Sequence, residues 1–112
     1  MIKAVDVSEH NGVVDYDYLR SQGVEAVIIR AGYGKGLSQI DSQFERNYNS
    51  AKKAGLKVGI YWYSYALTTA EAVAEAEACL NAIKGKSFDL PVYYDVEEKT
   101  QMSRVVTQAI IP

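Results

Sequence analysis

The sequence predicts an α/β fold, the (βα)4 half of a TIM-like (β/α) barrel with parallel strands and with helices outside. Three observations favour this architecture: four apolar runs of strand length recur, helical segments separate them, and each run becomes polar on one face towards its C-terminal end. Strands that alternate with helices favour parallel pairing through right-handed crossovers. No linker or sequence repeat divides the 112 residues, so we expect one domain over residues 1–112.

The strands are expected at residues 2–8, 25–34, 56–66 and 89–98. Successive side chains of a strand point to opposite faces, so each strand has an apolar face and a second, more polar one. An open doubly wound sheet buries both faces under helices, whereas a barrel wall carries an active site at its C-terminal mouth. The polar faces are expected to hold Asp6, Ser8, Arg30, Tyr61, Tyr63, Tyr65, Tyr93, Asp95 and Glu97.

The helices are expected at residues 15–23, 41–55, 68–85 and 100–112. Asp15 can cap the start of the first helix and Gly23 can end it. Thr68 and Glu71 have the spacing of a capping box. Cys79 is expected to be a small buried residue on the third helix. The apolar stripes that would pack on the sheet are Phe44, Tyr48 and Ala51; Val73, Ala76, Leu80 and Ile83; and Met102, Val105, Val106, Ala109 and Ile110.

Composition narrows the class of protein. The chain is 48 % hydrophobic and 23 % charged with a net charge of −2, as in ordinary globular proteins. No basic block indicates nucleic-acid or membrane partners, and no run approaches the roughly 20 apolar residues of a membrane span. The first residues lack the pattern of a signal peptide, so we expect synthesis in the cytoplasm. The segment AGYGKG fits neither a dinucleotide fingerprint nor a P-loop, so no nucleotide cofactor is expected.

The acids of the last run point to a reaction. Asp95 and Glu97 have Cα atoms about 6.5–7 Å apart if both lie on one strand. Paired carboxylates at this range suit cleavage of a glycosidic bond, in which one acid protonates the leaving oxygen and the other stabilises or attacks the cationic sugar carbon. Glu97 is the better acid because it is longer and nearer the mouth. Asp95 and Asp6 would remain ionised, and Arg30 could pair with one of them.

Two other interpretations of these acids stay open. The charged residues could form a buried Arg–Asp network that only holds the barrel together. Alternatively, Asp6, Asp95 and Glu97 could hold Mg²⁺. Their spacing fits no standard metal motif, and the single histidine near them in sequence, His10, is interpreted as a loop residue at the mouth. We therefore expect no metal.

Several segments together resemble the family 25 glycoside hydrolases, which are lysozymes of phages and Gram-positive bacteria. They are DVSEHNG, VIIRAGYG, AGLKVGIYWYSYA and YYDVEE, within residues 2–98. The resemblance implies cleavage of the β-1,4 bond between N-acetylmuramic acid and N-acetylglucosamine in the peptidoglycan of the bacterial cell wall. It implies Glu97 as proton donor, with Asp95 and Asp6 as assisting carboxylates. Tyrosines, notably Tyr61, would line the cleft, and the further candidates for substrate binding are Tyr63, Tyr93, Arg30 and Ser8.

The resemblance also implies a barrel of about eight strands and roughly 250 residues, whereas four strands are expected here. The chain is then either a fragment of such a lysozyme or a half-barrel that assembles. In the second case two copies would pair the first strand of each with the fourth strand of the other, because open edges and an uncovered inner face are unfavourable in water. The rival functions are a non-catalytic module that binds wall glycan and a structural half-barrel without a ligand.

Overall fold

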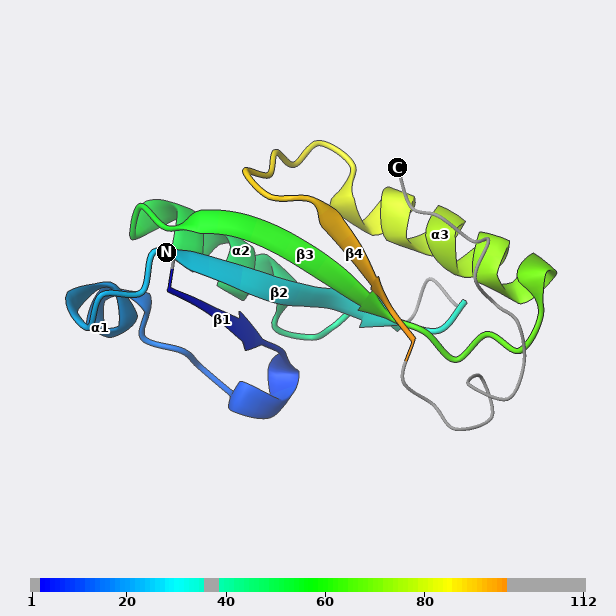
Figure 1. The fold of residues 1–112 in the computed structure, drawn as a ribbon, viewed down its shortest axis with the longest axis horizontal. Helices are drawn as coiled ribbons and strands as arrows, with labels where there is room; N and C mark the ends of the chain where they lie inside the picture. The colour runs from blue at the N-terminus through cyan, green and yellow to red at the C-terminus, as the bar shows by residue number, and fades with distance from the viewer. Residues whose placement is uncertain (1–2, 36–38, 97–112) are drawn as a thin grey trace.

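The computed structural model describes residues 3–35 and 39–96 (Figure 1). Its elements are β1 (Ala4–Val7), the 3-10 helix η1 (Glu9–Asn11), α1 (Tyr16–Ser21), β2 (Ala26–Tyr33), α2 (Phe44–Lys53), β3 (Lys57–Tyr63), α3 (Thr69–Ile83) and β4 (Val92–Asp95). The four predicted strands and the first three predicted helices are confirmed, with shorter bounds. The helix expected at 100–112 lies outside the described residues.

All four strands are parallel and lie in one sheet in the order β1-β2-β3-β4. When each strand pairs with the next one along the chain, right-handed crossovers place every connecting helix on the same side of the sheet. Accordingly, α2 packs on β2 and β3, and α3 packs on β2. Figure 1 shows α2 behind β2 and β3 and α3 beside β4, and no α-helix of the described part of the chain lies in front of the sheet. No described helix is long and apolar enough to cross a membrane.

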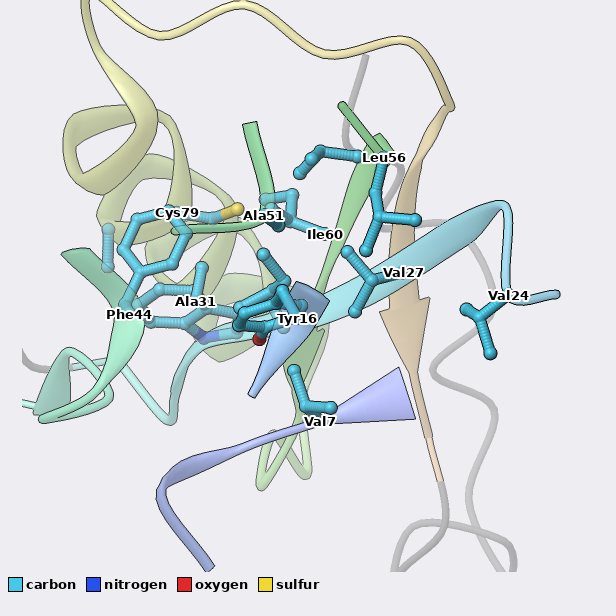
Figure 2. Packing of buried hydrophobic residues seen from close by; sticks show 14 residues of the cluster. Val7, Tyr16, Val24, Val27, Ala31, Phe44, Ala51, Leu56, Ile60 and Cys79 are labelled. Atoms are coloured by element: carbon cyan, nitrogen blue, oxygen red, sulfur yellow. The ribbon is translucent and has the colours of Figure 1, made fainter. Parts of the chain in front are cut away.

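The covered face of the sheet carries the apolar half of each strand. Val27 and Ile29 of β2 and Val58 and Ile60 of β3 are inaccessible to solvent. Figure 2 shows how the helices complete this core, with Tyr16, Phe44, Ala51 and Cys79 among the residues that they contribute. Cys79 is buried as predicted, and burial raises the pKa of its thiol to about 12. The thiol is therefore a packing group at neutral pH.

A fully buried tryptophan, Trp62, fixes the end of β3 against the turn that follows β2. Its indole nitrogen donates a hydrogen bond to the carbonyl oxygen of Gly34 over 2.8 Å. The ring also passes so close to Gly32 that a Cβ there would lie 2.5 Å from Cη2 of the tryptophan. Position 32 must therefore be glycine, because any side chain there would collide with the indole ring.

Helix ends follow the expected capping chemistry. Asp15 accepts a hydrogen bond from the backbone nitrogen of Tyr18 over 3.0 Å, and Gly23 follows α1 with φ +89°. Thr68 accepts from the backbone nitrogen of Glu71 over 3.1 Å. The Glu71 carboxylate reaches one residue farther back than in a capping box, to the nitrogen of Leu67. That bond, with the neighbouring Lys35, holds the pKa of Glu71 below its usual value.

The predicted apolar stripe of α3 is wrong in part. Val73 and Leu80 are 47 % and 42 % exposed, while Ala76 and Ile83 are half-buried against the core. The helix turns a neighbouring stripe to the sheet because small side chains allow a close approach and because a buried glutamate finds hydrogen-bond donors there. That stripe consists of Ala72, Glu75, Ala78 and Cys79.

Helices α1 and α2 are joined on the covered face by one buried hydrogen bond. The Tyr16 hydroxyl donates to Oδ1 of Asn47 over 2.8 Å, and Asn47 is inaccessible to solvent. Tyr16 is 3 % exposed, and burial raises the pKa of its phenol. The sequence offers a matched contrast on the same helix, since Tyr18 is 60 % exposed.

We expect Tyr16→Phe to lower the free energy of unfolding by about 1–2 kcal/mol, because it leaves a buried amide oxygen without its donor. Tyr18→Phe removes the same hydroxyl from a solvated ring and is expected to change stability by less than about 0.5 kcal/mol. Urea unfolding of both variants beside the parent chain measures the difference. Equal effects of the two substitutions would contradict the assigned hydrogen bond.

Candidate active site at the carboxyl ends of the strands

Side chains from three strands meet on the uncovered face of the sheet. Strand alternation sends Asp6 of β1, Tyr61 of β3, and Tyr93 and Asp95 of β4 to this face, and the register pairs Tyr61 with Tyr93. Together with Ile28 and Tyr94, they line a hollow of about 410 Å³. The structure therefore brings together two of the predicted carboxylates and two of the predicted tyrosines.

A second hollow of about 320 Å³ adjoins the first. It is lined by Ser8, His10, Arg30, Tyr61, Tyr63, Tyr65 and Asp95. Tyr61 and Asp95 line both hollows, so the two are neighbours at the carboxyl ends of the strands, and together they are called the depression from here on. Every predicted site residue within the described ranges lines one hollow or both. Glu97, the predicted proton donor, lies outside the described residues.

Burial and the charges around this depression together shift the pKa of the Tyr61 phenol. Burial raises the pKa of its phenol to about 12, and the positive charge of Arg30 acts in the opposite direction. The negative charges of Asp6, Asp95 and Asp41 raise the pKa further, because they oppose formation of a phenolate. At neutral pH Tyr61 is therefore a protonated phenol that can donate a hydrogen bond to a polar ligand.

Arg30 has other partners than the sequence suggested. The sequence alone allows Arg30 to pair with Asp6 or Asp95. Instead its Nε lies 2.8 Å from Oδ2 of Asp41, and its Nη2 lies 3.0 Å from Oε1 of Glu9. These acids come from the segments that follow β1 and β2, and those segments meet above the carboxyl ends of the two strands.

Asp41 joins these two segments. Its buried carboxylate also accepts hydrogen bonds from the backbone nitrogens of Glu9 and Gln43, at 3.0 and 2.9 Å. Burial works against the charge of Arg30, but the hydrogen bond to Asp41 and the nearby negative charges outweigh it and raise the pKa of the guanidinium. A structural Arg–Asp network thus exists beside the hollows, built from Glu9 and Asp41 rather than from the predicted site acids. Sequence reasoning missed both.

Aromatic rings form one wall of the second hollow. The Tyr63 and Tyr65 ring centroids are 5.2 Å apart, and Tyr65 meets Tyr33 edge-on at 6.2 Å. The guanidinium carbon of Arg30 lies 5.1 Å from the centroid of Tyr33. Amphipathic rings of this kind suit ligands with polar groups and apolar faces.

Sequence reasoning also missed Glu75 on α3, which is buried behind the sheet and bonded to Ser64 and Tyr94. Its one sequence signal is its spacing from Ala72 and Cys79 on the stripe that packs inward. Within residues 3–35 and 39–96, no three His, Cys, Asp or Glu side chains lie close enough together to hold a metal ion.

A parallel α/β sheet that gathers carboxylates and tyrosines at the carboxyl ends of its strands has the layout in which glycoside hydrolases place their sites. The comparison with known families agrees with this class. Glycosyl hydrolases family 25 matches residues 5–111, and the chain belongs to this family.

Individual relatives are similar over most of this chain. The autolytic lysozyme of Clostridium acetobutylicum is 38 % identical over 96 residues, which cover 86 % of this chain and 28 % of that protein. The modular autolysin LytC from Streptococcus pneumoniae, solved in complex with a synthetic peptidoglycan ligand, is 31 % identical with a TM-score of 0.76, over 86 % of this chain and 22 % of that one. A family 25 glycosyl hydrolase from Bacillus anthracis is 27 % identical with a TM-score of 0.76, over 88 % and 43 %. The chain thus spans less than half the length of each of these relatives.

The field around Tyr61 can be tested by titration. We expect the phenol to titrate near pH 12, and Asp6→Asn to lower its pKa because a negative charge that opposes the phenolate is removed. The ¹³Cζ chemical shift of labelled tyrosine, assigned with Tyr61→Phe, follows the titration. Asp17→Asn on the exposed side of α1 is the control and should leave the value unchanged. A Tyr61 that titrates near pH 10 would contradict the described surroundings.

Proposed function

We propose that residues 1–112 form part of the catalytic domain of a lysozyme-type hydrolase. Its reaction is cleavage of the β-1,4 bond between N-acetylmuramic acid and N-acetylglucosamine in peptidoglycan. The observation that carries this proposal is the convergence of Asp6, Tyr61, Tyr93 and Asp95 on one hollow at the uncovered face. The peptidoglycan ligand bound by LytC supports the same class of substrate.

The chemistry needs a proton for the leaving oxygen and negative charge beside the sugar carbon that becomes cationic. We assign the proton to Glu97, the residue two positions after Asp95 in the sequence. Asp95 and Asp6 supply the negative charge, from β4 and β1. Their carboxylates also favour the protonated form of a nearby acid, because ionisation of that acid would add a like charge.

Binding of the glycan strand is assigned to the tyrosines and to the polar groups of the second hollow. Tyr61 and Tyr93 line the first hollow, and Tyr63 lines the second. Ser8 and Arg30 complete the second hollow, where Arg30 shares its charge with Glu9 and Asp41. The proposed site of action is the bacterial cell wall, as for a phage lysin, and the chemistry requires neither cofactor nor metal.

The uncovered face and the two sheet edges raise the question of assembly. β1 and β4 are the edges of the sheet, and Tyr93 is exposed on the face between them. Open strand edges readily pair with another strand, and exposed apolar surface favours association. We propose that two copies pair β1 of each with β4 of the other, which closes an eight-stranded homodimeric barrel with the carboxylates inside.

Clearing of a Gram-positive cell-wall suspension tests the catalytic proposal. The parent chain is expected to clear the suspension, and Glu97→Gln to reduce the rate by about 10²–10⁴-fold, because a general acid contributes a factor of this size. Glu77→Gln, on an exposed position of α3, is the matched control and should clear at the parent rate.

Three outcomes would contradict the catalytic proposal. Equal clearing by the parent chain and Glu97→Gln would remove Glu97 as proton donor. Binding to insoluble wall without release of reducing ends would instead favour a glycan-binding module without catalysis. Neither binding nor release would favour a structural half-barrel.

The dimer is tested separately by light scattering after size exclusion at micromolar concentrations. The expected mass is twice the 12.4 kDa of one chain. Dilution should shift the mass towards that of one chain, because the pairing is intermolecular. A stable monomer across the whole series would count against the assembly and would leave the catalytic proposal to its own test.

A further inference from the structure

We propose that Glu75 is a positioning residue that fixes, from behind the sheet, the carboxyl ends of β3 and β4 and thereby the side chains that they present in front. The inference deepens the proposed function, on which it rests for the identity of the ligand. Within the described residues its hydrogen bonds go to Ser64, to Tyr94 and to the backbone of Tyr65, so it acts on the ligand-facing side chains through these residues.

The carboxylate of Glu75 accepts three hydrogen bonds from these two strand ends. Oε1 accepts from the Ser64 hydroxyl over 2.6 Å and from the Tyr94 hydroxyl over 2.5 Å. Oε2 accepts from the backbone nitrogen of Tyr65 over 2.8 Å. The residue is only 1 % exposed, so water does not compete for these bonds. One side chain of α3 therefore holds together the segment that follows β3 and Tyr94, the penultimate residue of β4.

The backbone carries this constraint to the front of the sheet. Tyr94 lies between Tyr93 and Asp95 in β4. It borders the first hollow, but it packs against the core cluster of the covered face, so its neighbours project to the uncovered face. The backbone nitrogen of Ser64 donates to the carbonyl oxygen of Asp95 over 2.9 Å. Both partners of Oε1 are thus coupled to Asp95, one by a peptide bond and one by a hydrogen bond.

If this position needed only to be packed, burying a carboxylate there would cost more free energy than burying an apolar side chain. A buried charge is costly unless it is paired or fully hydrogen-bonded, and an apolar side chain of similar size often stabilises more. Among the described residues no cation pairs with Glu75, and its three bonds go only to the two strand ends. Burial and the adjacent carboxylate raise the pKa of Tyr94, so its hydroxyl stays a donor. Unlike an apolar side chain such as leucine, the carboxylate accepts directed hydrogen bonds, which fix the positions of their donors.

The test uses the ¹⁵N-labelled chain and two mild variants, Glu75→Gln and Tyr94→Phe. The second keeps the ring and the fold even if the first does not fold. Two quantities are measured: hydrogen exchange of the Ser64 amide relative to that of Ile29 in the core, and the Kd for the soluble tetramer of β-1,4-linked N-acetylglucosamine. Glu77→Gln makes the same chemical change as Glu75→Gln on the solvent side of α3 and is the control.

We expect both variants to speed exchange at Ser64 about tenfold more than at Ile29 and to weaken binding about tenfold, since a hydrogen bond to a charged acceptor contributes at least one such factor. The control should change neither quantity. Equal acceleration at Ser64 and Ile29 would mean that Glu75 supports only global stability and would overturn the inference. An altered exchange ratio with unchanged Kd in a chain that binds would overturn it too. If the parent chain does not bind the tetramer, the proposed glycan site fails, and the exchange ratio alone still decides whether Glu75 positions the strand ends.

Discussion

The constraint on which this structure depends is the sequential parallel pairing of its strands. Because each strand lies beside the next one in the chain and every crossover has the same hand, α2 and α3 pack on a single face of the sheet. The apolar half of each strand is used there, as the buried Val27 and Ile60 show. The side chains on the other face of each strand are not needed for the core. Asp6 and Asp95 can therefore lie on strands that would have to be apolar throughout if both faces were covered.

The acids of this fold fall into two groups that differ in their surroundings. Asp41 and Glu75 are buried, and each accepts three hydrogen bonds from donors on different segments. Asp41 ties the segments after β1 and β2, while Glu75 ties the ends of β3 and β4, so together they brace the depression from both sides. Asp6 and Asp95 instead line the hollow itself. The supporting acids are therefore buried and bonded to fixed donors, whereas the acids that face a ligand line the hollow.

Strand alternation and helix capping were the parts of this fold that the sequence could predict, because both are local. The face that holds Asp6, Tyr61 and Asp95 follows from a period of two residues, and the cap at Asp15 follows from one hydrogen bond. The partners of Arg30 could not be predicted, since Glu9 and Asp41 lie 21 and 11 residues away and meet only when two loops fold over the sheet. The buried stripe of α3 was missed because hydrophobicity favoured Val73 over Glu75, whereas hydrogen bonding in three dimensions decides the orientation.

The seating of Trp62 has a consequence for how the molecule can be observed. It is the only tryptophan in the chain, it is fully buried, and its indole nitrogen is bonded to the turn after β2. Its emission is therefore an intrinsic optical reporter of one defined place, the junction between β3 and the turn that follows β2. A red shift marks the entry of water at that junction, so loosening of the turn can be followed in real time without an attached dye.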